Sequence, residues 1–281
     1  MIFETTDLFE YFKFDRGNKV AGRLVAYRHG QMSELNVIKK RPAMLVLPGG
    51  GYGFVSQREA EPIAMEFYSR GFDAFVLEYD IAPAFCYPAQ ITEAAMAMVY
   101  LRENAEKLDL IPDKIAAVGF SAGGHLLGCI STLWDDPAIV SLFGDRCTLV
   151  RPDASVYSYP VVTSDPEYYH GGSFRNFCSD KVKHEDYSIE KKVRKECSPA
   201  FIWSTSEDTC VPPMNSVLLY EAYLKNGVPC ELHIFREGWH GLSTCDFEVY
   251  KEDIIKDFML HVKSWLNLSA EFLKGLGFQA K

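Results

Sequence analysis

Apolar and polar positions alternate with two different rhythms along this chain. Near the N-terminus, the segments Leu8–Phe14 and Val20–Tyr27 alternate with a period of two, and the turn formers Asp15–Asn18 separate them. Alternation interrupted by turn residues is typical of a hairpin of two antiparallel strands. We therefore predict that residues 1–40 supply hairpin strands to a sheet.

From Arg41 onward, short apolar runs alternate with longer amphipathic segments. The short runs predict buried strands, and the longer segments predict helices. The predicted strands are Met44–Leu47, Phe72–Tyr79, Lys114–Phe120, Ala154–Tyr159, Phe201–Thr205 and Glu231–Phe235. The predicted helices are Glu59–Tyr68, Gln90–Leu108, Pro213–Asn226 and Phe247–Leu266. This alternation implies right-handed crossovers and a mainly parallel sheet with helices on both faces, an α/β fold.

The segment 163–199 interrupts this alternation. It is polar, contains Tyr168–Gly172, and lies between two predicted core strands. Such a segment predicts a small insertion over the carboxyl edge of the sheet, where a cap that shapes a substrate site would lie. Because 281 residues is an ordinary length for a single large α/β sheet domain, we expect one domain spanning residues 1–281.

Composition limits the partners of this domain. Of 281 residues, 48% are hydrophobic, which is enough to bury a large core, and the net charge is −9. The basic cluster Lys191–Lys195 is flanked by Glu190 and Glu196 and fits a solvated surface. We therefore expect neither a nucleic-acid nor a membrane partner. The sequence leaves the oligomeric state, including a homo-oligomer, open.

The N-terminus and the cysteines bear on the compartment. Met1–Asp7 has neither a basic start nor an apolar core, so a secretory signal is not expected. No apolar run approaches the length of a membrane span. The eight cysteines lack CxxC spacing, which favours reduced, mostly buried thiols and a cytoplasmic location.

Ser121 stands at the centre of the sequence Gly-Phe-Ser-Ala-Gly, residues 119–123. The apolar run Ile115–Val118 precedes this pentapeptide, and the apolar stretch Leu126–Ile130 follows it. A serine between a strand and a helix, with glycine two residues before and after it, is the signature of a nucleophile elbow. The hydroxyl would lie at a helix N-terminus, whose free amide groups stabilise a nearby anion. We therefore interpret Ser121 as a nucleophile.

A serine nucleophile needs a base and a group that orients the base. In this kind of sheet the order along the chain is serine, acid, histidine. Asp208 follows the predicted strand Phe201–Thr205 and is the candidate acid; Glu207 is its competitor, and capping of the next helix is the alternative role for Asp208. His240 follows the next strand in a glycine-flanked loop, and it is the candidate base.

The other histidines fit the base less well. His125 lies one turn after Ser121 on the same helix, where packing or a bond to backbone is expected, and His170 lies in the predicted cap, where it either contacts substrate or is solvated. The remaining histidines are His29, His184, His233 and His261. No pair has metal-ligand spacing such as HExxH, so we expect neither a metal nor a cofactor.

The loop Leu47–Tyr52 contains three consecutive glycines after the first predicted parallel strand. Glycines let backbone N–H groups face a reacting oxyanion without interference from side chains, and the amide of Ala122 would add a further donor. The loop does not match a P-loop, since no Gly-Lys-Ser/Thr follows, and it does not match a GxGxxG fingerprint, since Phe54–Ser56 follow Gly51–Gly53. A flexible turn remains an alternative.

At these residues the chain resembles the α/β-hydrolase superfamily. It is most similar to the small acetylxylan-esterase-like and carboxylesterase branch, related to hormone-sensitive-lipase-like and arylformamidase-like enzymes. The matching segments are LPGGGYGFVSQREAEPIAMEF, FVLEYDIAP, YPAQITEAAMAMVYLRENAEKLDLIPDKIAAVGFSAGGHL, SEDTCVPPMNS and GVPCELHIFREGWHG.

This resemblance implies an eight-stranded mixed sheet and a set of roles. Ser121 would be the nucleophile, Asp208 the acid and His240 the base. The amide groups of Gly50, Gly51 and Ala122 would form the oxyanion hole. One departure is that relatives commonly have His where Pro48 stands, so the glycine loop must be braced differently here.

The expected function is hydrolysis of short acyl esters, acetyl esters on sugars in particular, so the expected partner is a small ester. Tyr52 and Trp239 are candidate substrate contacts; Tyr79 and Trp203 are further candidates for a sugar-stacking wall, with core packing as the alternative role for all four. The rival interpretations are an arylformamidase or other amidohydrolase of the same fold, and a non-catalytic binding protein. The chain lacks the repeats of a propeller, which argues against an oligopeptidase, and it lacks a cysteine at an elbow, which argues against a thiol enzyme.

Overall fold

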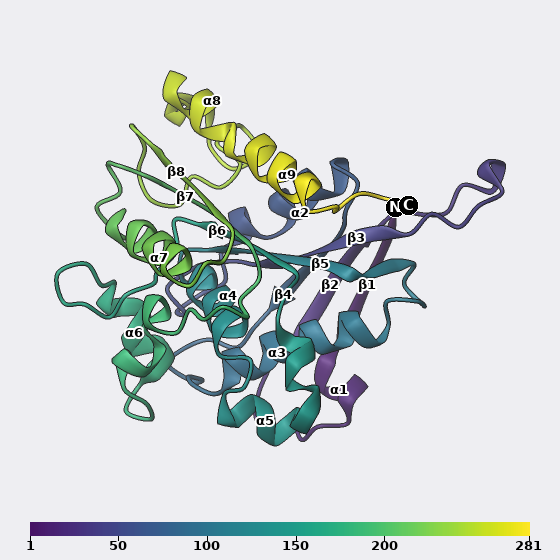
Figure 1. Ribbon diagram of the computed structural model, residues 1–281, viewed down its shortest axis with the longest axis horizontal. Coiled ribbons are helices and arrows are strands. Elements are labelled where there is room, and N and C mark those ends of the chain that lie inside the picture. Colours follow the sequence, from purple (N-terminus) through teal and green to yellow (C-terminus); the bar gives the residue numbers. More distant parts are fainter.

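The computed structural model describes residues 1–281 and is built on one eight-stranded sheet, with strand order β1-β2-β4-β3-β5-β6-β7-β8 (Figure 1). The strands are β1 Ile2–Asp7, β2 Arg23–Arg28, β3 Arg41–Leu47, β4 Asp73–Glu78, β5 Leu110–Phe120, β6 Ala154–Ser158, β7 Ala200–Thr205 and β8 Cys230–Phe235. β2 runs antiparallel to β1 and to β4. The six strands that follow one another across the sheet from β4 through β3 to β8 are all parallel. The predicted eight-stranded mixed sheet is therefore confirmed.

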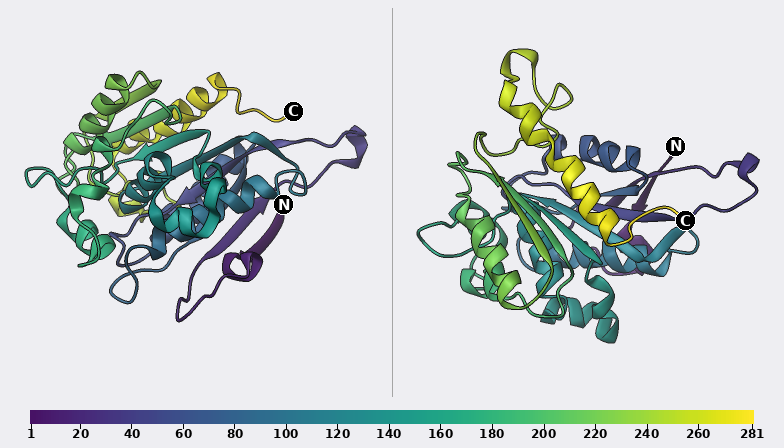
Figure 2. Two further views of the ribbon diagram at one scale, coloured as in Figure 1. Left: turned by 60° about the horizontal axis from the view of Figure 1, so that its bottom comes forward. Right: turned by 45° about the horizontal axis from the view of Figure 1, so that its top comes forward.

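Helices cover both faces of the sheet, as the alternation predicts. The helices are α1 Leu8–Phe12, α2 Glu61–Ser69, α3 Ala89–Glu103, α4 Ala122–Thr132, α5 Pro137–Phe143, α6 Gly171–Cys178, α7 Met214–Lys225, α8 Asp257–Lys263 and α9 Trp265–Gly275. One core cluster joins a sheet face to α3, α4 and α7, and a second joins the other face to α2, α8 and α9 (Figures 1 and 2). Alternating residues of β3 serve the two cores: Leu45 and Leu47 face the first, and Met44 and Val46 face the second.

The N-terminal hairpin differs from its prediction. Residues Leu8–Phe12 form the short helix α1 rather than a strand, and the antiparallel partner of β2 is Ile2–Asp7. The Asp7 side chain accepts the Glu10 N–H at 3.1 Å and caps the helix, and Leu8 and Phe9 are buried. The cap and the burial of this face override the period-two pattern.

Two predicted helices differ from the structure. The helix expected over Gln90–Leu108 is α3, which ends at Glu103. The single helix expected over Phe247–Leu266 is two helices, α8, which begins only at Asp257, and α9, which begins at Trp265 and ends at Gly275. Before α8 the Asp246 carboxylate accepts the Glu248 N–H at 3.1 Å, and such a local side-chain bond competes with helix formation.

The segment 163–199 contains α6 and short 3₁₀ turns, and it packs on the first core. Phe174, Phe177 and Ile189 are buried there, and a Cβ on Gly128 of α4 would lie only 2.7 Å from the Ile189 side chain. Asn176 of α6 also donates to the Gly51 carbonyl at 2.8 Å, so the segment touches the glycine loop at the carboxyl end of β3.

No single helix has the length and hydropathy that are needed to cross a membrane. The helix α4 and the segment Pro137–Val150 reach that length and hydropathy only as a pair bent by 64°. Every residue of α4 is buried within the protein.

Candidate active site

Ser121 lies on a strained turn between β5 and α4. Its backbone angles are φ 52° and ψ −117°, in a region that non-glycine residues rarely occupy. The flanking glycines are required by close backbone contacts: a Cβ on Gly119 would lie 2.4 Å from the Gly123 carbonyl oxygen, and one on Gly123 would lie 2.0 Å from the Leu47 carbonyl oxygen. The elbow therefore has the geometry that the pentapeptide predicts.

The structure brings Ser121, His240 and Asp208 into one hydrogen-bonded chain. His240 Nε2 lies 2.8 Å from Ser121 Oγ, and His240 Nδ1 lies 2.6 Å from Asp208 Oδ2. The Asp208 side chain is fully buried, and its other oxygen accepts the N–H groups of Cys210 and Val211 at 2.9 Å each. These bonds fix the carboxylate so that it can orient the imidazole.

Glu207, the competitor for the acid position, points elsewhere. Its carboxylate accepts the Gly238 N–H at 3.2 Å, and the Thr205 hydroxyl donates to the Gly238 carbonyl at 2.8 Å. Glu207 and Thr205 therefore hold the loop that carries His240, while Asp208 contacts His240 itself.

The glycine loop adjoins the nucleophile. A Cβ on Gly49 would lie 3.0 Å from Ser121 Cβ, and Gly50 and Gly51 adopt φ values of 120° and 61°. The amide groups of Gly50, Gly51 and Ala122 donate to no acceptor within the protein.

Side chains distant in sequence brace the glycine loop around Pro48 and the glycines that follow it. The Tyr79 hydroxyl donates to the Pro48 carbonyl at 2.6 Å, and Glu59 accepts the Gly49 N–H at 2.9 Å. Asn176 holds the Gly51 carbonyl from the other side. The sequence gives one weak signal for these roles: an acid, Glu59, closely follows the glycines, just before an amphipathic helix.

His125 is structural, as its position one turn after Ser121 suggests. It is buried, its Nε2 donates to the Tyr187 carbonyl at 2.9 Å, and its Nδ1 accepts the Tyr52 hydroxyl at 2.8 Å. Burial lowers the pKa of His125 to about 4, so the ring is neutral near pH 7.

The predicted aromatic contacts separate into two groups. Tyr52, Tyr79 and Trp203 are buried, so they offer no ring surface for stacking, and the expectation that Tyr52 contacts substrate does not fit its bond to His125. Trp239 differs: it is 37% exposed beside His240, and its ring meets Tyr250 and Phe258 edge to face.

His170 lies near the candidate site, at the start of α6. Its Nδ1 lies 2.8 Å from the Ser173 hydroxyl, and Ser173 Oγ is the atom nearest to a Cβ built on Gly51. Burial, followed by the nearby charge of His240, lowers the pKa of His170. The cap thus places an imidazole beside the glycine loop and His240.

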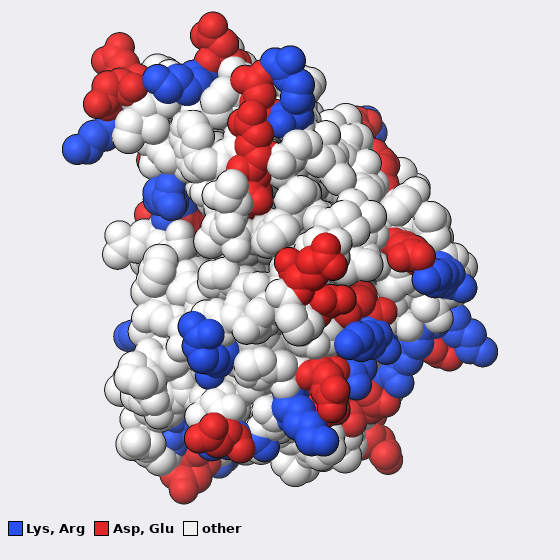
Figure 3. All heavy atoms as spheres, turned by 90° about the vertical axis from the view of Figure 1, so that its left-hand side faces the viewer, with Lys and Arg blue, Asp and Glu red and all other residues white.

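One face of the molecule carries charges of both signs. Figure 3 shows the left-hand side of the molecule in Figure 1, where acidic and basic side chains are interspersed among broad uncharged areas. The residues form no cluster of three or more His, Cys, Asp or Glu that could hold a metal ion.

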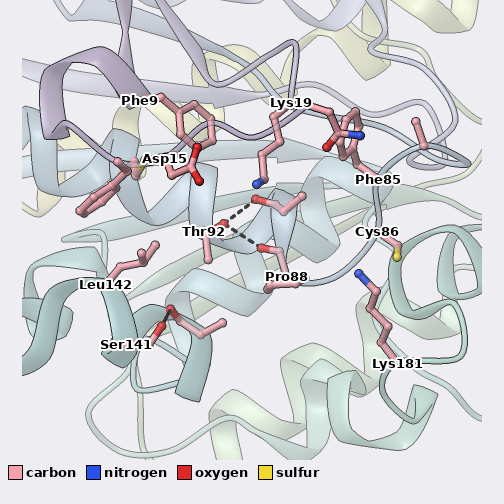
Figure 4. Close-up of a pocket in the computed structure, with 16 residues that line it drawn as sticks. Phe9, Asp15, Lys19, Phe85, Cys86, Pro88, Thr92, Ser141, Leu142 and Lys181 are labelled. Atoms are coloured by element: carbon pink, nitrogen blue, oxygen red, sulfur yellow. Dashed lines mark hydrogen bonds between the residues drawn. The ribbon is translucent and has the colours of Figure 1, made fainter.

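A cavity of about 540 Å³ lies apart from Ser121, among α1, α3 and α5 (Figure 4). Its lining includes Phe9, Phe85, Leu142, Lys19 and Lys181, and none of the Ser121, His240 and Asp208 side chains.

Two family models match the sequence. A model described as BD-FAE matches residues 34–148, and the model of the prolyl oligopeptidase family matches residues 95–264, more than half of the chain. An acetyl ester-xyloside bifunctional hydrolase from Caldicellulosiruptor lactoaceticus is 33% identical, with a TM-score of 0.81 over 98% of this chain and 97% of that one. The chain belongs to the α/β-hydrolase superfamily, in its carboxylesterase branch.

Among the curated relatives, one is named a xylanase and another an esterase. An endo-1,4-beta-xylanase B from Butyrivibrio fibrisolvens is 35% identical over 81% of this chain, and an acetylxylan esterase from Xylanibacter ruminicola is 28% identical over 79%. The matched regions span 35% and 45% of those proteins, so the chain covers less than half of their length. A carboxylesterase from Lactobacillus plantarum, 24% identical with a TM-score of 0.83, has the same fold.

Proposed function

We propose that this protein is a serine esterase that removes short acyl groups, acetyl in particular, from carbohydrate esters. The hydrogen-bonded chain from Ser121 through His240 to Asp208 carries this proposal, because acyl transfer by serine needs a base within hydrogen-bond reach and a group that orients it. The ester class follows from the family, and the acetylated sugar is suggested by relatives named acetylxylan esterase and acetyl ester-xyloside hydrolase.

In the proposed reaction, Ser121 Oγ attacks the acyl carbon while His240 Nε2 takes the hydroxyl proton. The amide groups of Gly50, Gly51 and Ala122 stabilise the oxyanion of the tetrahedral intermediate. His240 then protonates the leaving alcohol, and an acyl-enzyme remains on Ser121. Water attacks the acyl-enzyme with His240 again as base, and the carboxylic acid leaves.

The direct test is the variant Ser121→Ala with p-nitrophenyl acetate as substrate. We expect hydrolysis to be abolished while circular dichroism and the melting temperature remain those of the wild-type protein. Retained turnover in Ser121→Ala would overturn the assignment of the nucleophile.

A second candidate function is amide hydrolysis on the same site, and the match to the prolyl oligopeptidase family favours it. The two activities share the attack by serine and differ in the leaving group. A panel of acetylated xylo-oligosaccharides, simple aryl acetates and aryl formamides separates them: the ester proposal expects the highest kcat/KM on an acetyl ester, and a preference for the formamides would contradict it.

A further inference from the structure

A buried carboxylate lies behind the glycine loop. Glu59, in the 3₁₀ turn Gln57–Glu59, has 3% of its surface exposed. Its Oε2 accepts the Gly49 N–H at 2.9 Å, and its Oε1 accepts the Tyr159 hydroxyl at 2.7 Å. Both of these partners are neutral groups. Burying a carboxylate costs free energy unless hydrogen bonds compensate, so the position of Glu59 calls for an explanation.

The Tyr159 end of this network leads to the base. Tyr159 directly follows β6, and its ring meets the His240 ring edge to face, with centroids 5.0 Å apart. Its hydroxyl also accepts the Ser243 N–H at 3.1 Å, in the loop that follows His240. Burial, and next the charge of Glu59, hold the pKa of Tyr159 well above its ordinary value, so the phenol keeps the proton that it donates.

The Gly49 end of the network leads to the nucleophile and the oxyanion hole. A Cβ on Gly49 would lie 2.8 Å from Glu59 Oε2 and 3.0 Å from Ser121 Cβ, so the backbone of Gly49 is held between the carboxylate and the serine. The amides of Gly50 and Gly51 follow directly in the chain. A shift of the Gly49 peptide would therefore move the donors that stabilise the oxyanion.

We propose that Glu59 is a positioning residue that holds the glycine loop and the loop after His240 in a fixed position relative to each other. It acts through Gly49 and Tyr159 and touches neither substrate nor the reacting atoms. A carboxylate suits this position because each of its oxygens accepts a bond from a donor. An amide has one accepting and one donating end, so glutamine cannot serve both donors. The inference rests on the proposed function.

The test compares Glu59→Gln with Glu61→Gln, a matched change at an exposed residue at the start of α2. With p-nitrophenyl acetate, we expect Glu59→Gln to lower kcat by about 10²-fold and to change KM by less than about threefold, because an oxyanion hole binds the transition state more tightly than the substrate. Glu61→Gln should keep kcat within about twofold of wild type. Glu59→Gln with wild-type kcat would overturn the proposal.

A double-mutant cycle locates the effect in the network. Tyr159→Phe removes one of the two donors, so it should also lower kcat, and the double variant Glu59→Gln/Tyr159→Phe should be no slower than Glu59→Gln by more than about threefold. Fully multiplicative losses would show that the two residues act separately, which contradicts a shared positioning role.

A measurement without substrate separates this inference from the proposed function. In Glu59→Gln, the amide NMR resonances of Gly49, Gly50 and Gly51 should shift, and in Glu61→Gln they should not. Unchanged glycine resonances in Glu59→Gln overturn the inference even if Ser121→Ala proves inactive. If Ser121→Ala retains activity, the proposed function fails, and the glycine resonances alone decide whether Glu59 positions the loop.

Discussion

The elbow at Ser121 and the glycine loop are both rich in glycine, but polar side chains from distant segments brace the loop. At the elbow, glycines are required because neighbouring backbone leaves no room: a Cβ on Gly123 would overlap the Leu47 carbonyl. In the glycine loop, two glycines are excluded in the same way: a Cβ on Gly49 would lie 2.7 Å from the Phe120 carbonyl oxygen, and one on Gly50 would lie 2.1 Å from the Phe54 carbonyl oxygen. Gly51 has open space around its Cα, with the nearest atom 3.9 Å from a Cβ, and its φ of 61° is what favours glycine there. The elbow is thus fixed by backbone contacts, whereas the glycine loop combines such contacts with hydrogen bonds from distant polar side chains.

Because of this difference, the two regions are sensitive to different substitutions. Adding a methyl group to the elbow forces backbone atoms apart, whereas the glycine loop can also be disturbed by the removal of a hydrogen-bond partner. Tyr79 and Glu59 hold the C=O and the N–H of the peptide group between Pro48 and Gly49, and Asn176 holds the Gly51 carbonyl.

The largest effect tests the acid that serves the elbow. Asp208→Asn keeps the shape of the side chain but favours the wrong tautomer of His240, so we expect kcat to fall by about 10³-fold to 10⁴-fold. Glu207→Gln is the matched control, because Glu207 contacts Gly238 rather than His240. Steady-state kinetics on p-nitrophenyl acetate measure both variants, and a larger loss in Glu207→Gln would reverse the assignment.

The second prediction breaks the elbow by steric overlap. In Gly123→Ala, the new Cβ would lie 2.0 Å from the Leu47 oxygen and 2.5 Å from the Pro48 oxygen, both of them backbone atoms. We expect the free energy of unfolding to fall by about 3 kcal/mol or more. Gly275→Ala, where nothing lies within 4 Å of the Cβ, should change stability by less than about 0.5 kcal/mol. Urea denaturation of both variants checks this contrast.

The third prediction concerns His125, which joins the elbow helix to Tyr52 of the glycine loop. Its folded pKa of about 4 lies below its ordinary value of 6.5, so the unfolded chain binds the proton more readily. Stability contributed by neutral His125 is complete above pH 6.5 and is lost as the pH falls toward 4. Between pH 7 and pH 5 this residue should account for a loss of about 2 kcal/mol.

Denaturation at both pH values, in wild type and in His125→Gln, isolates this contribution. The variant cannot titrate at position 125, so its loss of stability between pH 7 and pH 5 should be smaller than that of wild type by the same amount. Equal losses in the two proteins would show that His125 is not buried in its neutral form.

The smallest expected effect is a decrease in kcat when one polar contact of the glycine loop is removed. Asn176→Ala removes the donor to the Gly51 carbonyl, and we expect kcat to fall about threefold to tenfold, in line with the net strength of one hydrogen bond. Asn226→Ala, which removes a comparable side-chain bond to the Ala222 carbonyl after α7, should leave kcat unchanged. An equal loss in both variants would indicate a general effect on stability.

The contrast also explains what the sequence could predict. The elbow and the loops of Asp208 and His240 are local patterns at strand ends, so their residues were identified and the structure brings them together. The sequence does not predict the side chains that hold the glycine loop, because Glu59, Tyr79 and Asn176 contact this loop only in the folded protein. The sequence predicts that Tyr52 contacts substrate because it shows that Tyr52 lies next to the glycines, but it does not show that the Tyr52 side chain is buried.

The same reasoning applies to the fold. The parallel strands have strong apolar runs and were predicted correctly from β3 to β8. The prediction of a strand at Leu8–Phe12 is wrong, because a capping hydrogen bond from Asp7 and contacts with the core decide the conformation of so short a segment. The cytoplasmic location and the single-domain organisation stay predictions.

The acyl-enzyme on Ser121 is the most direct test of the account. Wild-type protein, mixed with p-nitrophenyl acetate and quenched in acid during turnover, should carry one acetyl group on the peptide that contains Ser121, as mass spectrometry of the digest would show. The same peptide from Ser121→Ala should carry none. Rapid hydrolysis with no acetyl group on Ser121 at any quench time, or acetylation of a different residue during turnover, would contradict the central claim.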